Sequence, residues 1–254
     1  MDVRHWIFLS PHLDDAALSC GGLLWDLAQN GHQVEIWTLF AGNPPDEDFS
    51  PFAQQMHQDW GVTGAEAAAL RKAEDQRACE ILGVEYRHFN YLDAIYRRDQ
   101  VTGKPVVNNN NELFGKPPEK PLINDITQQL LDLLPSEAAL VSPMGLGTHL
   151  DHLAVLKAAE ETSQVPHYYA DYPYILKEYT PTNERWETIF YPLNEAALRA
   201  WQEAVLTYNS QIGQFWRDDA ELRLCLRNYM AGGGGRLWKS LTLNKALGGH
   251  SLDS

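Results

Sequence analysis

Strand-like apolar runs alternate with helix-like segments along most of the chain, and this alternation limits the folds that are open to it. Residues 6–9 and 34–40 are predicted strands. Helical patterns cover residues 14–30 and 66–82, and each is followed by a glycine that suits a helix end. Repeated strand–helix units form a mostly parallel sheet with helices on both faces. We therefore predict a Rossmann-like three-layer α/β sandwich, with residues 1–254 forming a single domain.

The same alternation continues toward the end of the chain. Two long segments, residues 41–64 and 99–121, are predicted to be irregular, either as substrate-facing lids or as disordered tips. The remaining predicted strands are residues 85–92, 139–142, 167–174 and 188–191, and the remaining predicted helices are residues 122–134, 150–162, 195–208 and 219–230. In folds of this kind ligands bind beyond the carboxyl ends of the strands, so the active site is expected there.

The charge of the chain argues against several classes of partner. With 34 acidic and 20 basic residues the formal net charge is −14, which repels nucleic-acid phosphates and anionic membranes. No apolar run approaches the roughly 20 residues of a membrane span, and the first residues do not resemble a signal peptide. We therefore predict a cytoplasmic protein with neither a nucleic-acid partner nor a membrane partner. A homo-oligomer is compatible with the sequence.

A histidine and two carboxylates follow the first predicted strand. His12, Asp14 and Asp15 stand just before the first predicted helix. Imidazole nitrogens and carboxylate oxygens are zinc ligands, and His12 and Asp15 are spaced so that both can point to one side. Asp14 is then left for a water or a substrate. Aspartate at a helix N-terminus is also a common cap, so this cluster alone favours a cap over a metal site.

A second cluster, at the end of the strand 139–142, changes that balance. His149 and His152 are one helical turn apart and share a face, while Thr148 and Asp151 have the spacing of a capping box. Protonated histidine is unfavourable at a helix N-terminus, so neutral imidazoles there suit metal binding or the polarisation of a carbonyl. Together the two clusters predict one catalytic metal site with three protein ligands and a water.

The paired clusters resemble the LmbE/PIG-L family of zinc-dependent N-deacetylases. The hallmarks of this family are a His-Pro-Asp-Asp segment after the first strand and a later His-x-Asp-His segment. Leu13 stands where the family usually has proline, which weakens inference from the better-known sugar deacetylases. Weaker similarities to the family cover residues 70–74, 79–84, 91–93 and 208–211.

The resemblance implies a zinc ion held by His12, Asp15 and His152. Iron(II) or another divalent metal would also fit, because affinity alone does not fix the identity of the ion. The implied reaction is hydrolysis of an N-acyl amide, with the N-acetyl group of a small amino sugar or glycoconjugate as the expected substrate. Two alternatives stay open: an amidase of the same family that acts on a thiol or other conjugate, and a non-catalytic module that binds a sugar or a nucleotide.

The resemblance also assigns roles around the metal. Asp14 would be the general base that deprotonates the attacking water. His149 would stabilise the oxyanion and protonate the leaving amine, and Asp151 would orient His149 or hold its charge. Arg71 and Asp93 would contact the substrate. Their alternatives are an ion pair on the surface of a helix for Arg71 and a strand-end cap for Asp93.

Overall fold

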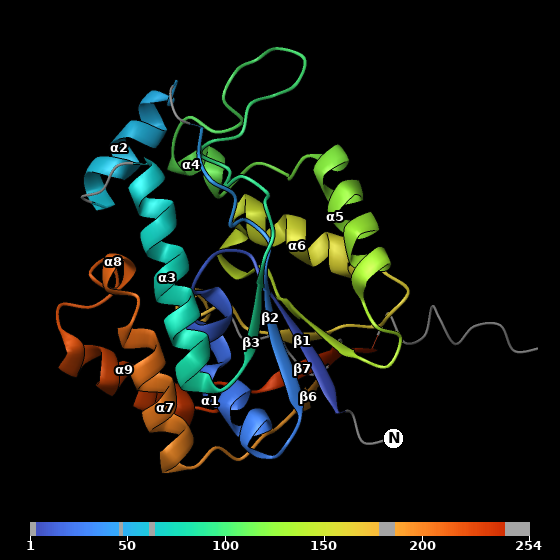
Figure 1. Ribbon diagram of the computed structural model, residues 1–254, viewed down its shortest axis with the longest axis vertical. Helices are drawn as coiled ribbons and strands as arrows, with labels where there is room; N and C mark the ends of the chain where they lie inside the picture. The colour runs from blue at the N-terminus through green and yellow to red at the C-terminus, as the bar shows by residue number, and fades with distance from the viewer. Residues whose placement is uncertain (1–3, 46–47, 61–63, 178–185, 242–254) are drawn as a thin grey trace, which may run out of the picture.

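One mixed sheet runs through the middle of the molecule (Figure 1). The computed structural model describes residues 4–45, 48–60, 64–177 and 186–241 of the chain. Within them the strand order is β3-β2-β1-β4-β5-β7-β6, and β7 alone runs opposite in direction to the other six strands. The strands are β1 (His5–Ser10), β2 (Gln33–Thr38), β3 (Glu85–His88), β4 (Ala139–Pro143), β5 (His167–Tyr169), β6 (Trp186–Ile189) and β7 (Leu237–Ser240).

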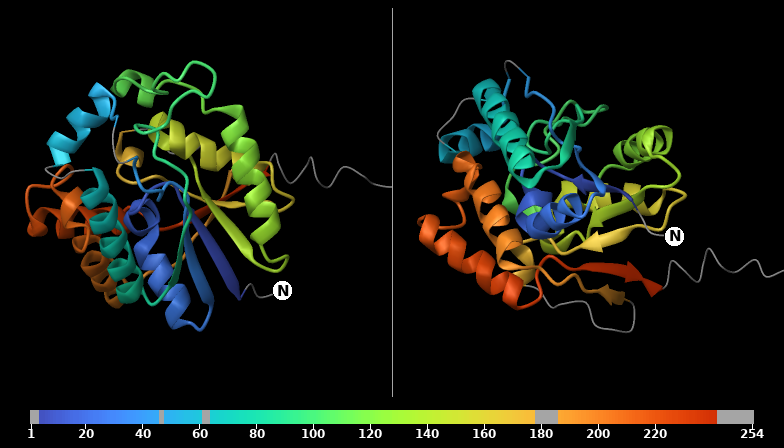
Figure 2. Two further views of the ribbon diagram at one scale, coloured as in Figure 1. Left: turned by 45° about the horizontal axis from the view of Figure 1, so that its top comes forward. Right: turned by 60° about the horizontal axis from the view of Figure 1, so that its bottom comes forward.

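Helices cover both faces of this sheet, as Figures 1 and 2 show. Along β1, Trp6 and Phe8 pack beneath α1, α3 and α7, while Ile7 and Leu9 pack beneath α5 and α6. The predicted three-layer sandwich is therefore confirmed. The helices are α1 (Asp15–Gln29), α2 (Pro51–Trp60), α3 (Gly64–Leu82), α4 (Asn110–Leu113), α5 (Lys120–Leu133), α6 (Leu150–Glu160), α7 (Glu195–Leu206), α8 (Asn209–Ile212) and α9 (Asp219–Ala231), with short 3-10 turns at Leu146–Thr148 and Tyr174–Leu176.

Several elements differ from the prediction. The segment 41–64 contains α2, which begins at Pro51, a residue type that suits the first turn of a helix. No strand was predicted after residue 230, whereas β7 follows the glycine run 232–235 and lies in the sheet between β5 and β6. The predicted strands 85–92 and 167–174 are shorter than expected, since β3 ends at His88 and β5 ends at Tyr169.

The adjacency of β1 and β4 positions the two polar clusters. Trp6 pairs with Ala139 and Phe8 with Val141 in parallel register, so the carboxyl ends of both strands meet at one edge of the sheet. The segment after β1 and the start of α6 therefore lie together. The helices α2 and α4 stand beyond this edge, near the top of Figure 1.

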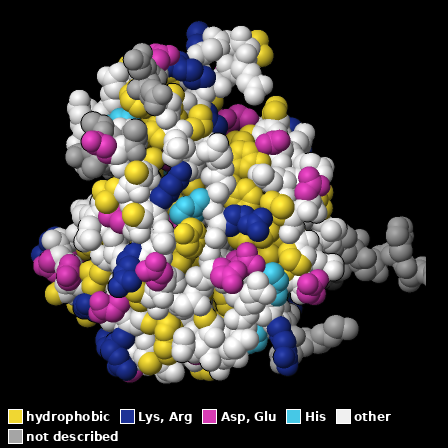
Figure 3. All heavy atoms as spheres, viewed as in Figure 1, with side chains coloured by type: hydrophobic (Ala, Val, Ile, Leu, Met, Phe, Trp, Pro, Cys, Tyr) yellow, Lys and Arg dark blue, Asp and Glu magenta, His cyan; other side chains and the backbone are white. Residues whose placement is uncertain are grey.

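The exposed surface carries mixed charge. On the face shown in Figure 3, Lys and Arg side chains are scattered among Asp and Glu and gather in no large patch. This pattern accords with the chain's excess of acidic over basic residues. Among the helices that the structure describes, none is both long enough and apolar enough to cross a lipid bilayer.

Candidate metal and catalytic site

The turn between β1 and α1 carries three ionisable side chains that are buried: His12, Asp14 and Asp15. Asp14 occupies the position before the first residue of α1, yet its side chain accepts no hydrogen bond from the helix. Asp15 Oδ2 instead accepts the main-chain N–H of His12 at 2.8 Å. The interpretation of Asp14 as a helix cap is therefore wrong, and its carboxylate is available at the cavity described below.

His12, Asp15 and His152 converge at the sheet edge. Asp15 Oδ2 lies 3.2 Å from His12 Nδ1 and 3.3 Å from His152 Nε2, and these three residues can offer ligand atoms within 4.8 Å of one another. The other nitrogen of each ring contacts a carboxylate, with His152 Nδ1 2.7 Å from Asp171 and His12 Nε2 3.0 Å from Asp151. Metal-binding histidines are typically oriented in this way, so the residues fit a divalent cation.

Asp171 was not among the predicted site residues and lies two residues beyond the end of β5. Its side chain is buried, and Asp171 Oδ2 accepts the main-chain N–H of Leu146 at 3.0 Å while Oδ1 contacts His152. Because β5 runs parallel to β4, its carboxyl end reaches the same edge of the sheet. The sequence signal that could have predicted Asp171 as a site residue is a carboxylate two residues after a strand of the sheet.

The first turn of α6 fixes the ring of His149. His149 Nδ1 accepts the main-chain N–H of Asp151 at 3.2 Å, so His149 itself caps the helix and the predicted Thr148–Asp151 capping box does not form. A main-chain N–H can only donate, so a neutral His149 carries its proton on Nε2. Burial and the neighbouring His12 hold the pKa of His149 well below its usual value. His149 is thus a neutral ring with one N–H donor.

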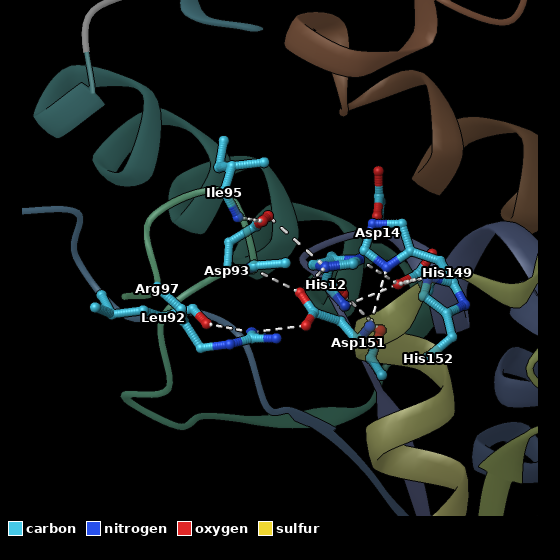
Figure 4. A network of polar contacts seen from close by, with 12 residues as sticks. His12, Asp14, Leu92, Asp93, Ile95, Arg97, His149, Asp151 and His152 are labelled. Atoms are coloured by element: carbon cyan, nitrogen blue, oxygen red, sulfur yellow. Dashed lines mark hydrogen bonds and ion pairs between the residues drawn. The ribbon is translucent and has the colours of Figure 1, made fainter. Parts of the chain in front are cut away.

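The carboxylate of Asp151 makes its hydrogen bonds and its ion pair with groups other than the ring of His149. Oδ2 contacts His12 Nε2 and accepts the main-chain N–H of Ala94, both at 3.0 Å, and Oδ1 lies 2.7 Å from Arg97 Nη1 (Figure 4). Asp151 therefore orients His149 through its main chain, and its carboxylate orients His12. This differs from the expected carboxylate contact with His149.

The pKa values of the two carboxylates in this turn are shifted in opposite directions. Burial and the charge of Asp15 raise the pKa of Asp14 to about 7, although Arg71 opposes the rise. Burial also acts to raise the pKa of Asp15, but the charges of His152 and His12 outweigh it and hold that pKa well below the usual range. Environments that split two carboxylates in this way leave one ionised and let the other exchange a proton near neutral pH.

An open cavity of about 460 Å³ leads to these groups. Both long segments contribute to it, since α2 supplies Met56 and Asp59 while the region of α4 supplies Asn110 and Phe114. The ring of Phe114 stands edge-on to His149, with 5.2 Å between ring centroids. Within their described residues, the segments 41–64 and 99–121 therefore face the site. The cavity is also lined by Ile95, Leu113, Tyr174, Gln211, Gln214 and Phe215.

The two predicted substrate-binding residues both line the cavity. Arg71 Nη2 lies 3.9 Å from Asp14 Oδ2. Glu74, which lies one helical turn further along α3 and would be the partner in the alternative ion pair on the helix surface, is bonded to Ser210 in α8. Asp93 Oδ2 lies 3.7 Å from His12 Nε2, and Oδ1 accepts a main-chain N–H two residues further on. Asp93 thus combines a turn-forming role with a place at the site.

Known proteins resemble this chain over most of its length. The family model described as "PIG-L: GlcNAc-PI de-N-acetylase" matches residues 7–163, which include both polar clusters. The 2'-N-acetylparomamine deacetylase of Niallia circulans is 28% identical over 250 residues, which cover 88% of this chain and 86% of that protein.

Solved structures of deacetylases are also similar. The crystal structure of a zinc-inhibited form of teicoplanin deacetylase matches with a TM-score of 0.73 and 27% identity, covering 93% of this chain and 97% of that one. The crystal structure of a deacetylase of the A40926 pseudoaglycone matches with a TM-score of 0.68 and 29% identity, covering 94% and 98%.

Proposed function

The chain belongs to the PIG-L family of de-N-acetylases, and on that premise we propose that it is a divalent-metal-dependent hydrolase that removes the acetyl group from an acetylated amino sugar. One observation carries the proposal. A three-residue cluster suited to a metal, His12–Asp15–His152, lies beside a carboxylate with a raised pKa and a neutral histidine, and all of them border one cavity. A module that only binds sugar needs neither Asp14 nor His149 in these states.

Each polar group then has a chemical task. His12, Asp15 and His152 would hold the cation, which supplies Lewis-acid polarisation of the acyl carbonyl and of the attacking water. Asp14 accepts the proton of that water as the oxygen attacks the acyl carbon. His149 donates from Nε2 to the carbonyl oxygen as negative charge develops there. As the C–N bond breaks, the proton that Asp14 took from the water passes to the leaving amine, because a neutral His149 holds a single proton and would be left as an anion if it gave that proton away. The expected role of His149 as the acid therefore does not fit its hydrogen bonds.

Replacing His149 by alanine should lower kcat without removing the metal. The ring supplies a hydrogen bond that strengthens as charge develops, and losing one such donor typically costs about 10²–10³-fold in kcat. Acetate release and metal content, measured on the same preparation, check this. Loss of the metal together with activity would mean that His149 is a ligand, which contradicts the proposed role.

The charge of the cavity bears on the class of substrate. Four aspartates line it, namely Asp14, Asp15, Asp59 and Asp93, whereas Arg71 is the single Lys or Arg among the lining residues that the structure describes. With these groups ionised the lining carries a net charge of −3, and a bound dication would leave about −1, so the cavity does not attract an anion and favours a neutral or cationic ligand. We therefore propose that the substrate is a small basic or neutral glycoside, with the chemistry of an acetylated aminoglycoside, and not a phosphate-bearing glycoconjugate.

A substrate panel tests both parts of this proposal. Acetate release from 2'-N-acetylparomamine should exceed that from N-acetylglucosamine 1-phosphate by about tenfold or more in kcat/KM, a difference that corresponds to about 1.4 kcal/mol. An amide-linked thiol conjugate in the same panel covers the amidase alternative. Preference for the phosphate ester would contradict the proposed charge selectivity, and turnover of the thiol conjugate alone would contradict the sugar substrate.

A further inference from the structure

We propose that Arg97 is a positioning residue. It holds the carboxylate of Asp151 in hydrogen bond with His12 and thereby selects where the metal binds. The inference rests on the proposed metal-dependent function. Arg97 does not line the cavity of the site, and it acts through Asp151 (Figure 4). It comes from the segment after β3, for which no periodic pattern predicts the direction of a side chain.

The guanidinium of Arg97 is fixed on several sides. Nη1 lies 2.7 Å from Asp151 Oδ1 and donates to the main-chain carbonyl of Leu92 at 2.9 Å. Nε and Nη2 donate to the two carboxylate oxygens of Glu119 at 2.9 and 3.3 Å. The guanidinium also lies 5.1 Å from the centroid of the Phe40 ring, and its side chain is 10% exposed. A rigid planar fork held in this way fixes the carboxylate that it contacts.

Asp151 has contacts at both of its oxygens as a result. Its side chain is completely buried, with Oδ1 beside Arg97 and Oδ2 accepting from His12 Nε2 and from the main chain of Ala94. A His12 that binds a metal is neutral, and because a carboxylate only accepts, its remaining proton is on Nε2, the nitrogen that faces Asp151. The lone pair of Nδ1 then points toward Asp15, the direction required of a metal ligand.

Two overlapping sets of side chains compete for a cation at this edge of the sheet. The two sets are His12–Asp15–His152 and His12–His149–Asp151. A cation in the second set would need an oxygen of Asp151, and it would remove the donor that His149 offers to the substrate. Arg97 already neutralises Asp151 across 2.7 Å, so a cation placed there would meet a like charge. Arg97 therefore favours the first set.

The Arg97→Met variant tests the inference through metal affinity. We expect the dissociation constant for the first Zn2+, measured by competition with a chelator, to rise by about tenfold or more, as it does when an outer partner of a ligand is lost. Inhibition by excess Zn2+ should also begin at a lower concentration. The matched control is Arg98→Met, which removes an exposed neighbour bonded to Asp48 and should leave the affinity within about twofold.

A double-mutant cycle separates positioning from general loss of structure. Asp151→Asn removes the charge on which Arg97 acts, so adding Arg97→Met to it should change the Zn2+ affinity much less than Arg97→Met does alone. If Arg97→Met does not fold, Glu119→Gln is the second variant. It weakens the ion pair that holds the Arg97 guanidinium and should likewise raise the dissociation constant for Zn2+. Strictly additive losses, or an unchanged affinity in the folded variant, would overturn the inference.

Zn2+ binding by the unaltered protein distinguishes a failure of the proposed function from a failure of the role of Arg97. An unaltered protein that binds no divalent metal contradicts the proposed function itself. An unaltered protein that binds Zn2+ tightly, together with an Arg97→Met variant that binds it equally tightly, contradicts only the role of Arg97.

Discussion

Replacing Asp14 by asparagine should remove nearly all turnover while the metal stays bound. Asparagine keeps the size of the side chain but cannot accept the proton of the attacking water, and a general base typically contributes about 10²–10⁴-fold to the rate. Asp14 lies outside the His12–Asp15–His152 cluster, so metal binding should persist. Acetate release gives the loss in kcat, and elemental analysis of the same sample gives the metal content.

Asp132→Asn is the matched control for this experiment, because it makes the same chemical change on an exposed part of α5. It should keep full activity and full metal content. An Asp14→Asn enzyme that turns over normally would refute the general base. One that has lost its metal would show that Asp14 is itself a ligand.

Replacing His152 by alanine should empty the metal site. Its side chain is 2% exposed and places Nε2 3.3 Å from Asp15 Oδ2, and alanine offers no ligand atom in its place. Two protein ligands would remain where a catalytic zinc needs three. The loss of its hydrogen bond also leaves the buried Asp171 without this partner, at a cost of about 1–3 kcal/mol in the free energy of unfolding.

Elemental analysis after dialysis measures the loss of the metal. A thermal melt of the metal-free protein measures the loss of stability. His32→Ala is the control, since His32 lies in the turn between α1 and β2, away from the cluster. Stoichiometric metal in the dialysed His152→Ala protein would refute its role as a ligand.

The fold and the core of the site could be predicted from the sequence for a simple physical reason. Parallel strands bring their carboxyl ends to one edge, so residues that follow β1 and β4 had to meet once those strands were neighbours. The spacing of His149 and His152 in one helical turn added the direction of their side chains. Spacing could not show that Asp14 leaves its helix uncapped, because a cap and a catalytic carboxylate occupy the same position.

The contacts that orient the site could not be predicted in this way. Arg97 and Glu119 are 22 residues apart, and Arg97 reaches both Glu119 and Asp151 only through the path of a segment without strand or helix periodicity. The role of the Asp151 carboxylate depended on a side-chain torsion that no pattern encodes. Similarly, β7 was missed because its four residues follow a glycine run and acquire their strand character from pairing with β5 and β6.

We propose that His12, Asp15 and His152 together hold a divalent metal. Anomalous X-ray scattering at the zinc edge, from crystals of the protein prepared with Zn2+, tests it most directly. We expect one dominant peak about 2.0–2.2 Å from His12 Nδ1, an oxygen of Asp15 and His152 Nε2. A dominant peak between His12 Nε2, His149 and Asp151 would contradict it, and so would the lack of any peak in crystals of active enzyme.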